Sequence, residues 1–567
     1  MTTPASAPPS PAKRPHPPGS GRHAALVAAG IFLSRIAGLV RQRVFAHYLG
    51  SGPVAGVFNA ALRIPNLLQN LLGEGVLSSS FIPVYAHLLA RGEEEEADRV
   101  AGAAAGLLAA ATAVLVALGM FATPVIVRLI TPGLGGEDHA LAIRLVRILF
   151  PALGTLVLSA WCLGVLNSHR RFFLSYVAPV VLNGVVVVAL VAAGWATRGE
   201  VDGLAREARI AGWAAWGYLA GAAAQLLAQL PTTLRLLGRH FRPSLDTARA
   251  AIRTVLYNFV PALIGRGVVQ LSAFVDLLYA SYSGTRGLAA LGYQQTLYLL
   301  PISLFGMAIS ASELPAMSAA VGSAEAVAAE LRGRLEGGLR RLAFFVIPSA
   351  AAFLVLGDVV AGALFQTGQQ RAADTRYLWL VLMGSTIGLL PATMGRLYAS
   401  AFYALKDTRT PLRFALLRLA LNAALAWFSA VRLPGLLGVP QELGLVGITA
   451  SSGLAAWLEY ALLRRALERR LGRTGLRDRT LARLWTCAAV AGAAGLGVKV
   501  ALAAWRGPMP GVAEQWGGGF LPPPELHPAL GAIPILGVYG VGYLALAVGT
   551  APGGARAALA RVRRRMG

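Results

Sequence analysis

The sequence has few charged residues and almost no cysteine. Only 14% of its 567 residues are Asp, Glu, Lys or Arg, whereas charged residues make up about a quarter of a soluble globular domain. Its two cysteines, Cys162 and Cys487, lie far apart in apolar stretches, which excludes a disulfide framework and a CxxC metal motif. We expect both to be small apolar packing residues, in a chain that has no soluble domain of ordinary composition.

The motifs of nucleotide-driven and hydrolytic chemistry are missing as well. The sequence has no GxxxxGK[ST] phosphate loop, no GxSxG nucleophile elbow, no dinucleotide-binding fingerprint and no HExxH metal motif. Its 8 histidines form no cluster with the spacing of metal ligands. We therefore predict that the protein is not an enzyme and that it carries no cofactor.

Long apolar runs dominate what is present. Hydrophobic residues make up 56% of the chain and the mean hydropathy is +0.60. Helices are predicted over residues 24–49, 60–90, 99–130, 139–166, 172–197, 209–236, 251–283, 287–320, 339–366, 375–402, 411–431, 441–465, 480–504 and 528–549. Because about 20 apolar residues span a bilayer, the fold class is an all-α polytopic membrane protein with about fourteen transmembrane helices.

The distribution of positive charge predicts the orientation. The formal net charge is +25, and most Lys and Arg residues fall in the connections on the same side as the termini. The positive-inside rule then places both termini in the cytoplasm and the helices in the inner membrane. Residues 1–22 and 551–567 are expected to be basic cytoplasmic tails, the first of them Pro-rich and disordered. The acidic run Glu93–Glu96 is expected to be a solvated turn, and no nucleic-acid partner is predicted.

An internal repeat predicts the domain organisation. Residues 149–183 resemble residues 389–422, with Pro151 aligned to Pro391 and a basic hairpin inside each copy. The offset corresponds to an even number of helices, so both copies run in the same direction. We therefore predict two six-helix lobes, 23–237 and 238–466, related by a pseudo-two-fold axis along the membrane normal. The two helices of residues 467–550 are additional.

Two neighbouring helices each carry arginine on a polar face. At 100° per residue, the polar residues of the first helix fall within about 120° of arc, opposite an apolar face. They are Ser34, Arg35, Gly38, Arg41 and Gln42, and the second helix has a similar stripe of Asn59, Arg63, Asn66, Asn70 and Glu74. An arginine deep in a membrane costs at least ~2.5–3.5 kcal/mol, so it should face a cavity or a partner.

This pattern predicts a wet, cationic cavity in the first lobe. Guanidinium groups offer planar pairs of donors that stay protonated, so such a cavity suits a phosphate or diphosphate. The alternative is that buried ion pairs such as Arg63–Glu74 hold the helices together. Five arginines near helix ends are expected to reach the membrane boundary by snorkelling: Arg43, Arg128, Arg144, Arg147 and Arg418.

The second lobe has two deep acids, Asp276 and Glu313. Either can pair with Arg266 on the same lobe or bind a cation, and the sequence leaves both readings of these carboxylates open.

Several motifs resemble one family. FLSRIAGLVRQRVFAHYLG and FNAALRIPNLLQNLLGEGVLSSSFIPVYA resemble the two opening helices of the MurJ/MviN family. FYALKDTRTP resembles its hairpin between helices 10 and 11, and LLPISLFGMAISASELPAMS resembles its helix 8. The resemblance covers residues 23–550 and implies membership of the multidrug/oligosaccharidyl-lipid/polysaccharide exporter superfamily.

The resemblance implies a lipid II flippase. Such a protein moves lipid II, the undecaprenyl-diphosphate-linked peptidoglycan precursor, from the cytoplasmic to the periplasmic leaflet for cell-wall biosynthesis. Its implied partners are lipid II, membrane lipids and the cell-wall synthesis machinery, and its coupling force is sodium or the membrane potential. The implied cavity residues are Arg35, Arg41, Arg63, Glu74 and Arg396, the implied sodium site is Asp276 with Asn422, and residues 467–550 would form the groove for the isoprenoid tail.

The chain departs from the family pattern at four positions. The family usually has an acid where Gln42 and Gly56 stand, and an arginine where Gln69 and Thr296 stand. Arg266, where the family often has a neutral residue, would restore one positive charge to the cavity.

Three functions stay open at this point. The first is lipid II flipping, and the second is export of another polyprenyl-diphosphate-linked glycan or of an amphipathic drug. The third is a non-transporting scaffold for envelope assembly. A carboxylate-rich cavity would favour export of cationic drugs, and loss of all inward arginines would favour a scaffold.

Overall fold

The structure is a computed structural model that describes residues 20–201, 203–319, 323–476, 478–504 and 527–550. The side chains of residues 20–28, 74, 265, 266, 268, 269, 311, 315, 316 and 324 also lie outside the description. The predicted tails therefore fall outside the described residues, except for 20–22, which already belong to the first helix. So do the side chains of two predicted site residues, Glu74 and Arg266.

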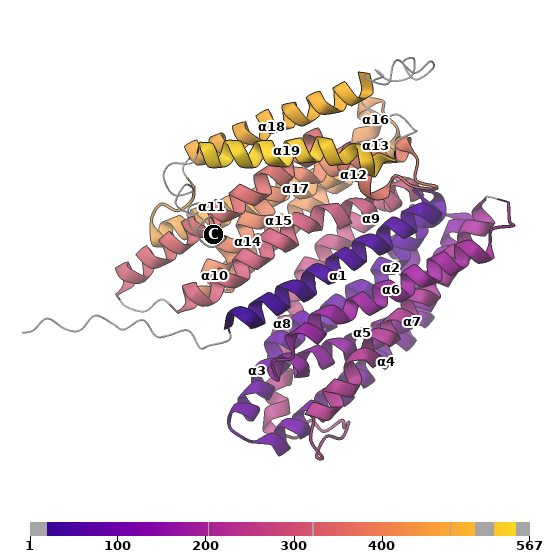
Figure 1. Cartoon of the computed structure of the whole chain (residues 1–567). Coiled ribbons are helices and arrows are strands. Elements are labelled where there is room, and N and C mark those ends of the chain that lie inside the picture. Colours follow the sequence, from indigo (N-terminus) through magenta and orange to yellow (C-terminus); the bar gives the residue numbers. More distant parts are fainter. Residues whose placement is uncertain (1–19, 202, 320–322, 477, 505–526, 551–567) are drawn as a thin grey trace, which may run out of the picture.

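The first half of the described chain folds into seven helices (Figure 1). They are α1 (Ser20–Leu49), α2 (Pro53–Leu72), α3 (Glu74–Ala90), α4 (Glu94–Ile130), α5 (Gly136–Ser168), α6 (Phe172–Ala196) and α7 (Leu204–Leu236). The break between α2 and α3 falls at Gly73, whose N–H bonds back to Gln69. One predicted helix is therefore two, joined end to end.

The second half has more interruptions. It comprises α8 (Ala250–Ser281), α9 (Gly284–Pro301), the π-helix η1 (Ile302–Met307), α10 (Ala308–Ser318), α11 (Ala324–Val355), α12 (Gly357–Phe365), α13 (Ala372–Thr386), α14 (Leu389–Ala404), α15 (Arg409–Trp427), the π-helix η2 (Phe428–Arg432), α16 (Leu433–Leu437), the short 3₁₀ helix η3 (Gln441–Leu443), α17 (Gly444–Leu471), α18 (Asp478–Ala504) and α19 (Pro528–Gly549). The π turn of η1 begins directly after Pro301, which cannot donate to the helix ladder.

The predicted all-α membrane architecture is confirmed. Within the described residues, ten helices are long and apolar enough to cross a membrane, and no strand occurs. This number is compatible with the predicted total of about fourteen spans.

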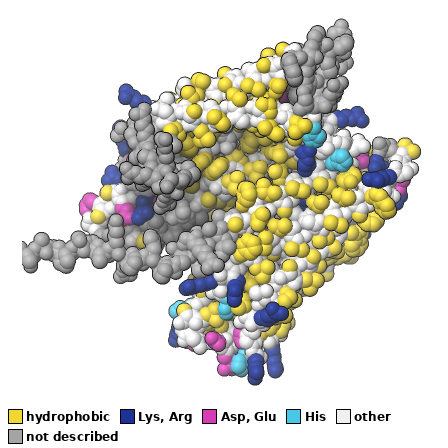
Figure 2. All heavy atoms as spheres, viewed as in Figure 1, with side chains coloured by type: hydrophobic (Ala, Val, Ile, Leu, Met, Phe, Trp, Pro, Cys, Tyr) yellow, Lys and Arg dark blue, Asp and Glu magenta, His cyan; other side chains and the backbone are white. Residues whose placement is uncertain are grey.

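The outer surface matches a lipid environment. Large apolar side chains are exposed along single helix faces, for example Phe121 and Val125 on α4 and Ile533 and Val541 on α19. Figure 2 shows hydrophobic side chains over most of the visible flank, with Lys and Arg near its ends. Such a belt would be an aggregation hazard in water but is what a bilayer core requires.

Helix packing joins the two halves of the chain along α2, α3, α8 and α9. In the first half, α6 packs against α1 and α7, and α5 packs against α2, α4 and α7. In the second half, α17 packs against α13, α14 and α15. The contacts of α2 with α9 and of α3 with α8 link the halves, and α18 and α19 pack together on α11 and α12 as an outer layer (Figure 1).

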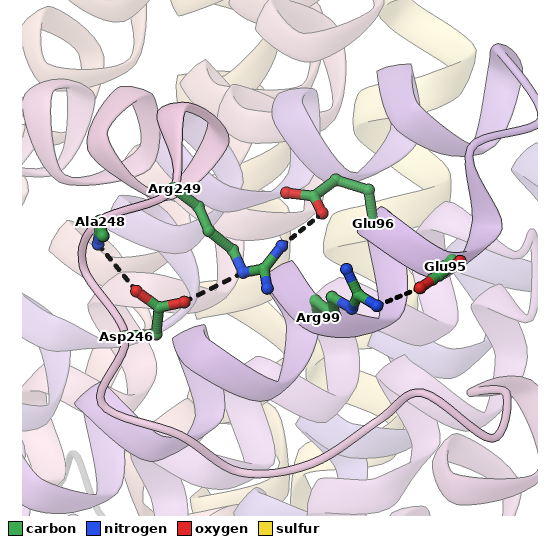
Figure 3. Close-up of polar contacts among 6 residues, drawn as sticks. All are labelled: Glu95, Glu96, Arg99, Asp246, Ala248 and Arg249. Atoms are coloured by element: carbon green, nitrogen blue, oxygen red, sulfur yellow. Dashed lines mark hydrogen bonds and ion pairs between the residues drawn. The ribbon is translucent and has the colours of Figure 1, made fainter.

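The connection between α7 and α8, residues 238–249, is fastened to the start of α4 (Figure 3). Arg249 donates to Glu96 at 2.8 Å and to Asp246 at 3.0 Å, and the N–H of Gly238 donates to Asp98 at 2.9 Å. The expectation that Glu93–Glu96 is only a solvated turn is therefore wrong, because one of these acids anchors the connection.

Candidate functional site

A polar cavity of about 410 Å³ lies among α1, α2, α5, α6, α7 and α9. Its lining residues are Ser34, Arg35, Gly38, Leu39, Arg41, Gln42, Asn59, Leu62, Arg63, Asn66, Gln69, Leu156, Pro179, Leu182, Asn183, Tyr218, Gln225, Gly292, Gln295, Thr296, Leu299 and Leu300. Three predicted arginines, Arg35, Arg41 and Arg63, are thus brought to one space. A further positively charged candidate, Arg396, does not line it; it lies exposed on α14, within electrostatic range of Tyr298.

The polar face of α1 turns toward the cavity because its opposite face is apolar. Phe32, Leu33, Ile36 and Val40 are exposed on the outside, as the 100° periodicity predicts. On α2, Asn59 and Arg63 line the cavity, whereas Asn70, further along the stripe, is exposed outside it.

Arg63 links the two halves of the chain. Its Nη2 donates to the side-chain oxygen of Gln295 at 2.7 Å and to the carbonyl of Leu291 at 3.3 Å, both on α9. The alternative pairing with Glu74 involves a side chain outside the described residues. One face of the arginine therefore binds α9, while the side chain still borders the cavity.

Amide and hydroxyl groups form the rest of the polar lining. Tyr218 on α7 donates to Asn66 at 3.0 Å, and Gln225, two turns further along α7, also lines the cavity. Sequence reasoning missed both residues of α7. The signal was available, since Tyr218, Gln225 and Gln229 recur on one face of an otherwise apolar segment.

The predicted cation ligands meet between α8 and α15. Asn422 donates its amide N–H to Asp276 Oδ1 at 2.9 Å. Asn422 is fully buried, and its own oxygen has no hydrogen-bond partner among the described residues. An oxygen of the half-buried Asp276 and the oxygen of the buried Asn422 fit a hard cation such as sodium, although no group of three His, Cys, Asp or Glu side chains occurs within the described ranges.

The other charged residues of the second half have protein partners. Glu313 pairs with Arg341 of α11, which settles its two open readings in favour of an ion pair with a different arginine. Arg418 pairs with Glu459 of α17 at 2.9 Å. The expectation that Arg418 snorkels is therefore wrong.

The two halves also meet at the end of the bundle where α1 ends, here called the Leu49 end. Arg43 donates to the carbonyls of Ala363 at 2.6 Å and Leu364 at 2.9 Å, at the end of α12. Ser51 donates to Gln370 at 2.9 Å, and Tyr293 donates to Gly50 at 2.5 Å. Arg43 is thus a cap for α12 and not a snorkelling side chain, and these bonds close the bundle at this end.

A family model for the lipid II flippase MurJ matches residues 45–507. The chain belongs to the MurJ family. The lipid II flippase MurJ of Burkholderia cenocepacia is 30% identical over 451 residues, covering 78% of this chain and 83% of the relative. The protein of Vibrio cholerae named "Probable lipid II flippase MurJ" is 29% identical over 462 residues, covering 78% of this chain and 82% of the relative.

Solved structures show the same fold. A structure of "Lipid II flippase MurJ, inward closed conformation" has a TM-score of 0.71 at 20% identity and covers 92% of this chain and 98% of its own. An inward-facing MATE multidrug transporter of the MOP superfamily has a TM-score of 0.62 at 17% identity, covering 79% and 98%. The chain is therefore a multi-pass inner-membrane protein of a transporter family, and the resemblance read from its motifs is confirmed.

The structure shows where the departures from the MurJ family pattern lie. Gln42, Gln69 and Thr296 all line the cavity, so the missing charges are missing there. Gly56 has a steric reason, because a Cβ at this position would come within 1.9 Å of the carbonyl oxygen of Thr285. The α2–α9 contact is too close for the acid usual in the MurJ family. The positive charge that Arg266 is expected to restore to the cavity belongs to a side chain outside the described residues.

The two C-terminal helices of this MurJ family member are held by a buried ion pair. Lys499 of α18 donates to Asp358 of α12 at 2.5 Å, and both side chains are at most 4% exposed. Tyr539 and Tyr543 of α19 donate to carbonyls of Pro348 and Phe344 on α11 at 2.6 and 2.7 Å. An apolar pocket of about 300 Å³ lies beside them, lined by Leu300, Pro301, Leu304, Phe305, Pro348, Ser349, Ala352, Phe353 and Tyr539. It shares Leu300 with the polar cavity.

Proposed function

We propose that this chain carries lipid II from the cytoplasmic to the periplasmic leaflet by alternating access. The observation that supports the proposal most is the arginine-lined cavity in a member of the lipid II flippase family. Arg35, Arg41 and Arg63 come from two helices and border one space. A diphosphate spreads its negative charge over several oxygens, which guanidinium groups bind in pairs.

The orientation follows from charge. With both termini in the cytoplasm by the positive-inside rule, the Leu49 end is the periplasmic end. The bonds of Arg43, Ser51 and Tyr293 then hold the periplasmic side of the cavity closed. Release of lipid II to the outer leaflet requires these bonds to break, while the contacts of α3 with α8 on the cytoplasmic side reorganise.

The two six-helix lobes supply the moving parts. Two hairpins support their equivalence, because Arg170 and Lys406 both adopt a left-handed conformation, with φ of 60° and 59°. In each hairpin the next N–H bonds back five residues, from Arg171 to Leu166 and from Asp407 to Phe402. Non-glycine residues rarely adopt this conformation, so its occurrence after α5 and after α14 favours a duplication.

The lipid tail stays in an apolar environment. The pocket beside Tyr539 shares a wall with the polar cavity. A polyprenyl chain in this pocket would leave its diphosphate on the arginine side of Leu300.

Asp276 and Asn422 are proposed to bind the coupling cation. The carboxylate and the unpartnered amide oxygen would both serve as ligands. A sodium ion bound there would hold α8 against α15, and so bias the lobes toward one arrangement. If the membrane potential drives transport instead, it would act on the charge of the Asp276 carboxylate and of the cation bound there.

A second candidate is export of a different polyprenyl-diphosphate-linked glycan. The observation that favours it is the replacement of two cavity arginines by Gln69 and Thr296. A non-transporting scaffold is not favoured, since three arginines still line the cavity.

Complementation of a bacterium depleted of its own lipid II flippase tests the proposal. We expect the wild-type chain to restore growth and cell shape. A chain that inserts and accumulates without restoring growth would point to the second candidate.

A further inference from the structure

The wall of the cavity formed by α5 and α7 carries a hydrogen-bond chain with a free acceptor at its end. Gln225 Nε2 donates to Ser159 Oγ at 2.9 Å, and Ser159 Oγ donates to Gln229 Oε1 at 2.8 Å. All three side chains are more than nine-tenths buried. Because the serine hydroxyl gives its only hydrogen to Gln229, it must accept from Gln225, which fixes the amide of Gln225 in one orientation.

This orientation leaves Gln225 Oε1 without a partner. The oxygen is buried and has no hydrogen bond among the described residues, and Gln225 lines the cavity. Buried carbonyl oxygens are nearly always paired in proteins. A buried acceptor without a partner, on a side chain that lines a binding cavity, is suited to a donor on the ligand.

The place of Gln225 along the cavity separates it from Arg63. Tyr218 and Asn66 mark one level of the cavity through their hydrogen bond. Gln225 lies seven residues beyond Tyr218, which is about 10 Å further along α7 toward its C-terminal end. Arg63 lies before Asn66 on α2, which runs parallel to α7, so it is on the other side of this level. A group bound by Gln225 is thus distinct from a charged group bound by Arg63, whereas Arg35, on α1, lies within about one helical turn of the level of Gln225.

The geometry points to a neutral subsite: we propose that Gln225 Oε1 accepts a hydrogen bond from an N–H or O–H of the transported head group, with Ser159 and Gln229 as positioning residues. This rests on the proposed function. The ligand class is an N-acetylated sugar or a peptide amide, attached to the diphosphate that the arginines bind. An acceptor fixed in this way discriminates against head groups that lack the donor.

Binding of three probes to the purified full-length protein tests the subsite. The probes are a polyprenyl diphosphate without sugar, the same lipid with an N-acetylated sugar, and the same lipid with sugar and peptide. We expect Gln225→Leu to weaken binding of one or both sugar-bearing probes about fivefold to tenfold, the worth of one neutral hydrogen bond. Binding of the sugar-free diphosphate should be unchanged.

The sugar-bearing probes also distinguish the source of the donor. Loss confined to the peptide-bearing probe assigns the donor to the peptide, and an equal loss for both assigns it to the sugar. Ser159→Ala should reproduce part of the effect, because it frees the Gln225 amide to turn. Thr233→Val is the matched control, since Thr233 is buried on the same helix and does not line the cavity.

Two results would overturn the subsite. One is wild-type affinity of Gln225→Leu for all three probes, and the other is an equal loss for the sugar-free diphosphate. Failure of the proposed function looks different, because the wild-type protein would then bind none of the diphosphates, or Arg35→Ala would bind them normally.

Discussion

Arg35, Arg41 and Arg63 show what a helical period can reveal at the scale of single residues. Each of the helices α1 and α2 has one polar and one apolar face, and this alone indicates the direction in which these arginines point. The sequence therefore predicts that all three line one cavity. The partners of Arg63 and Arg43 could not be predicted. They are carbonyl and amide groups of α9 and α12, and hydrophobic periodicity carries no information about which distant backbone will lie nearby.

The cavity arginines give the first residue-scale prediction. Arg35→Ala or Arg41→Ala should abolish complementation while the protein still accumulates in the membrane. Lysine at either position should rescue only in part, because it keeps the charge but loses the paired donors. Arg128→Ala, at an exposed position near the end of α4, is the control and should behave as wild type. Normal growth with both alanine variants would rule out a role for these guanidinium groups.

Asp276 and Asn422 give the second residue-scale prediction. If they bind the coupling cation, Asp276→Asn and Asn422→Ala should each slow transport and remove its dependence on sodium. The control is Glu313→Gln, which alters another buried acid whose partner is Arg341. This variant should keep the sodium dependence, measured as transport rate against sodium concentration. Sodium-dependent transport by Asp276→Asn would exclude the ion site.

Asp407, in the hairpin between α14 and α15, gives a prediction about pH. The backbone N–H and hydroxyl of Thr410 donate to its carboxylate, with Arg470 adding to them, and together they lower its pKa to about 2. An unfolded carboxyl titrates near ~3.9, so this stabilisation is complete above that pH and is lost as the pH falls toward 2. Asp407→Asn should therefore lower the Tm at pH 7 by about 2 °C.

The difference between Asp407→Asn and wild type should shrink in melts recorded at successively lower pH, from 7 toward 3. Thr408→Ala, in the same hairpin, should shift the Tm equally at every pH. A difference for Asp407→Asn that stays constant over this range would show that the carboxylate charge is not what stabilises the hairpin.

At the scale of elements, hydropathy located the helices but not their breaks or extensions. Helix α11 begins at Ala324, whereas hydropathy predicts a start near residue 339. The first turns of this helix are polar and are supported by the ion pair of Glu330 with Arg334 at 2.9 Å. A hydropathy window detects only the apolar part of such a helix. The break at Gly73 and the π turn after Pro301 depend on backbone hydrogen bonds, which no window of side-chain hydropathy measures.

Helix α12 is a nine-residue element tied at both ends. Asp358 in its first turn pairs with Lys499 of α18, and the carbonyls at its end accept from Arg43 of α1. It therefore connects the C-terminal helix pair with the closed Leu49 end.

The Lys499–Asp358 pair gives the element-scale prediction. Lys499→Met should destabilise the protein by about 3–5 kcal/mol, because it leaves a buried carboxylate uncompensated, whereas Lys499→Met with Asp358→Leu should regain most of this loss. Thermal unfolding of the purified variants measures both. A double variant as unstable as the single one would mean that the pair is needed for more than mutual neutralisation.

At the scale of the whole molecule, composition and resemblance predicted the all-α membrane fold and the family. The position of the cavity between α1–α2, α6–α7 and α9 needed the tertiary structure, since α9 comes from the other half of the chain. The role of residues 238–249 also needed it, because the attachment to α4 is made by charges in a segment with no apolar pattern. The two-lobe division stays a prediction.

That the arginine cavity carries lipid II across the membrane is tested most directly in reconstituted vesicles. Labelled lipid II is placed in one leaflet, and its arrival in the other is followed with a membrane-impermeant reagent. The wild-type protein should transfer the lipid, whereas Arg35→Ala with Arg41→Ala should transfer it no faster than protein-free vesicles. Equal transfer by both proteins, or none by the wild type under any sodium gradient or potential, would contradict the account.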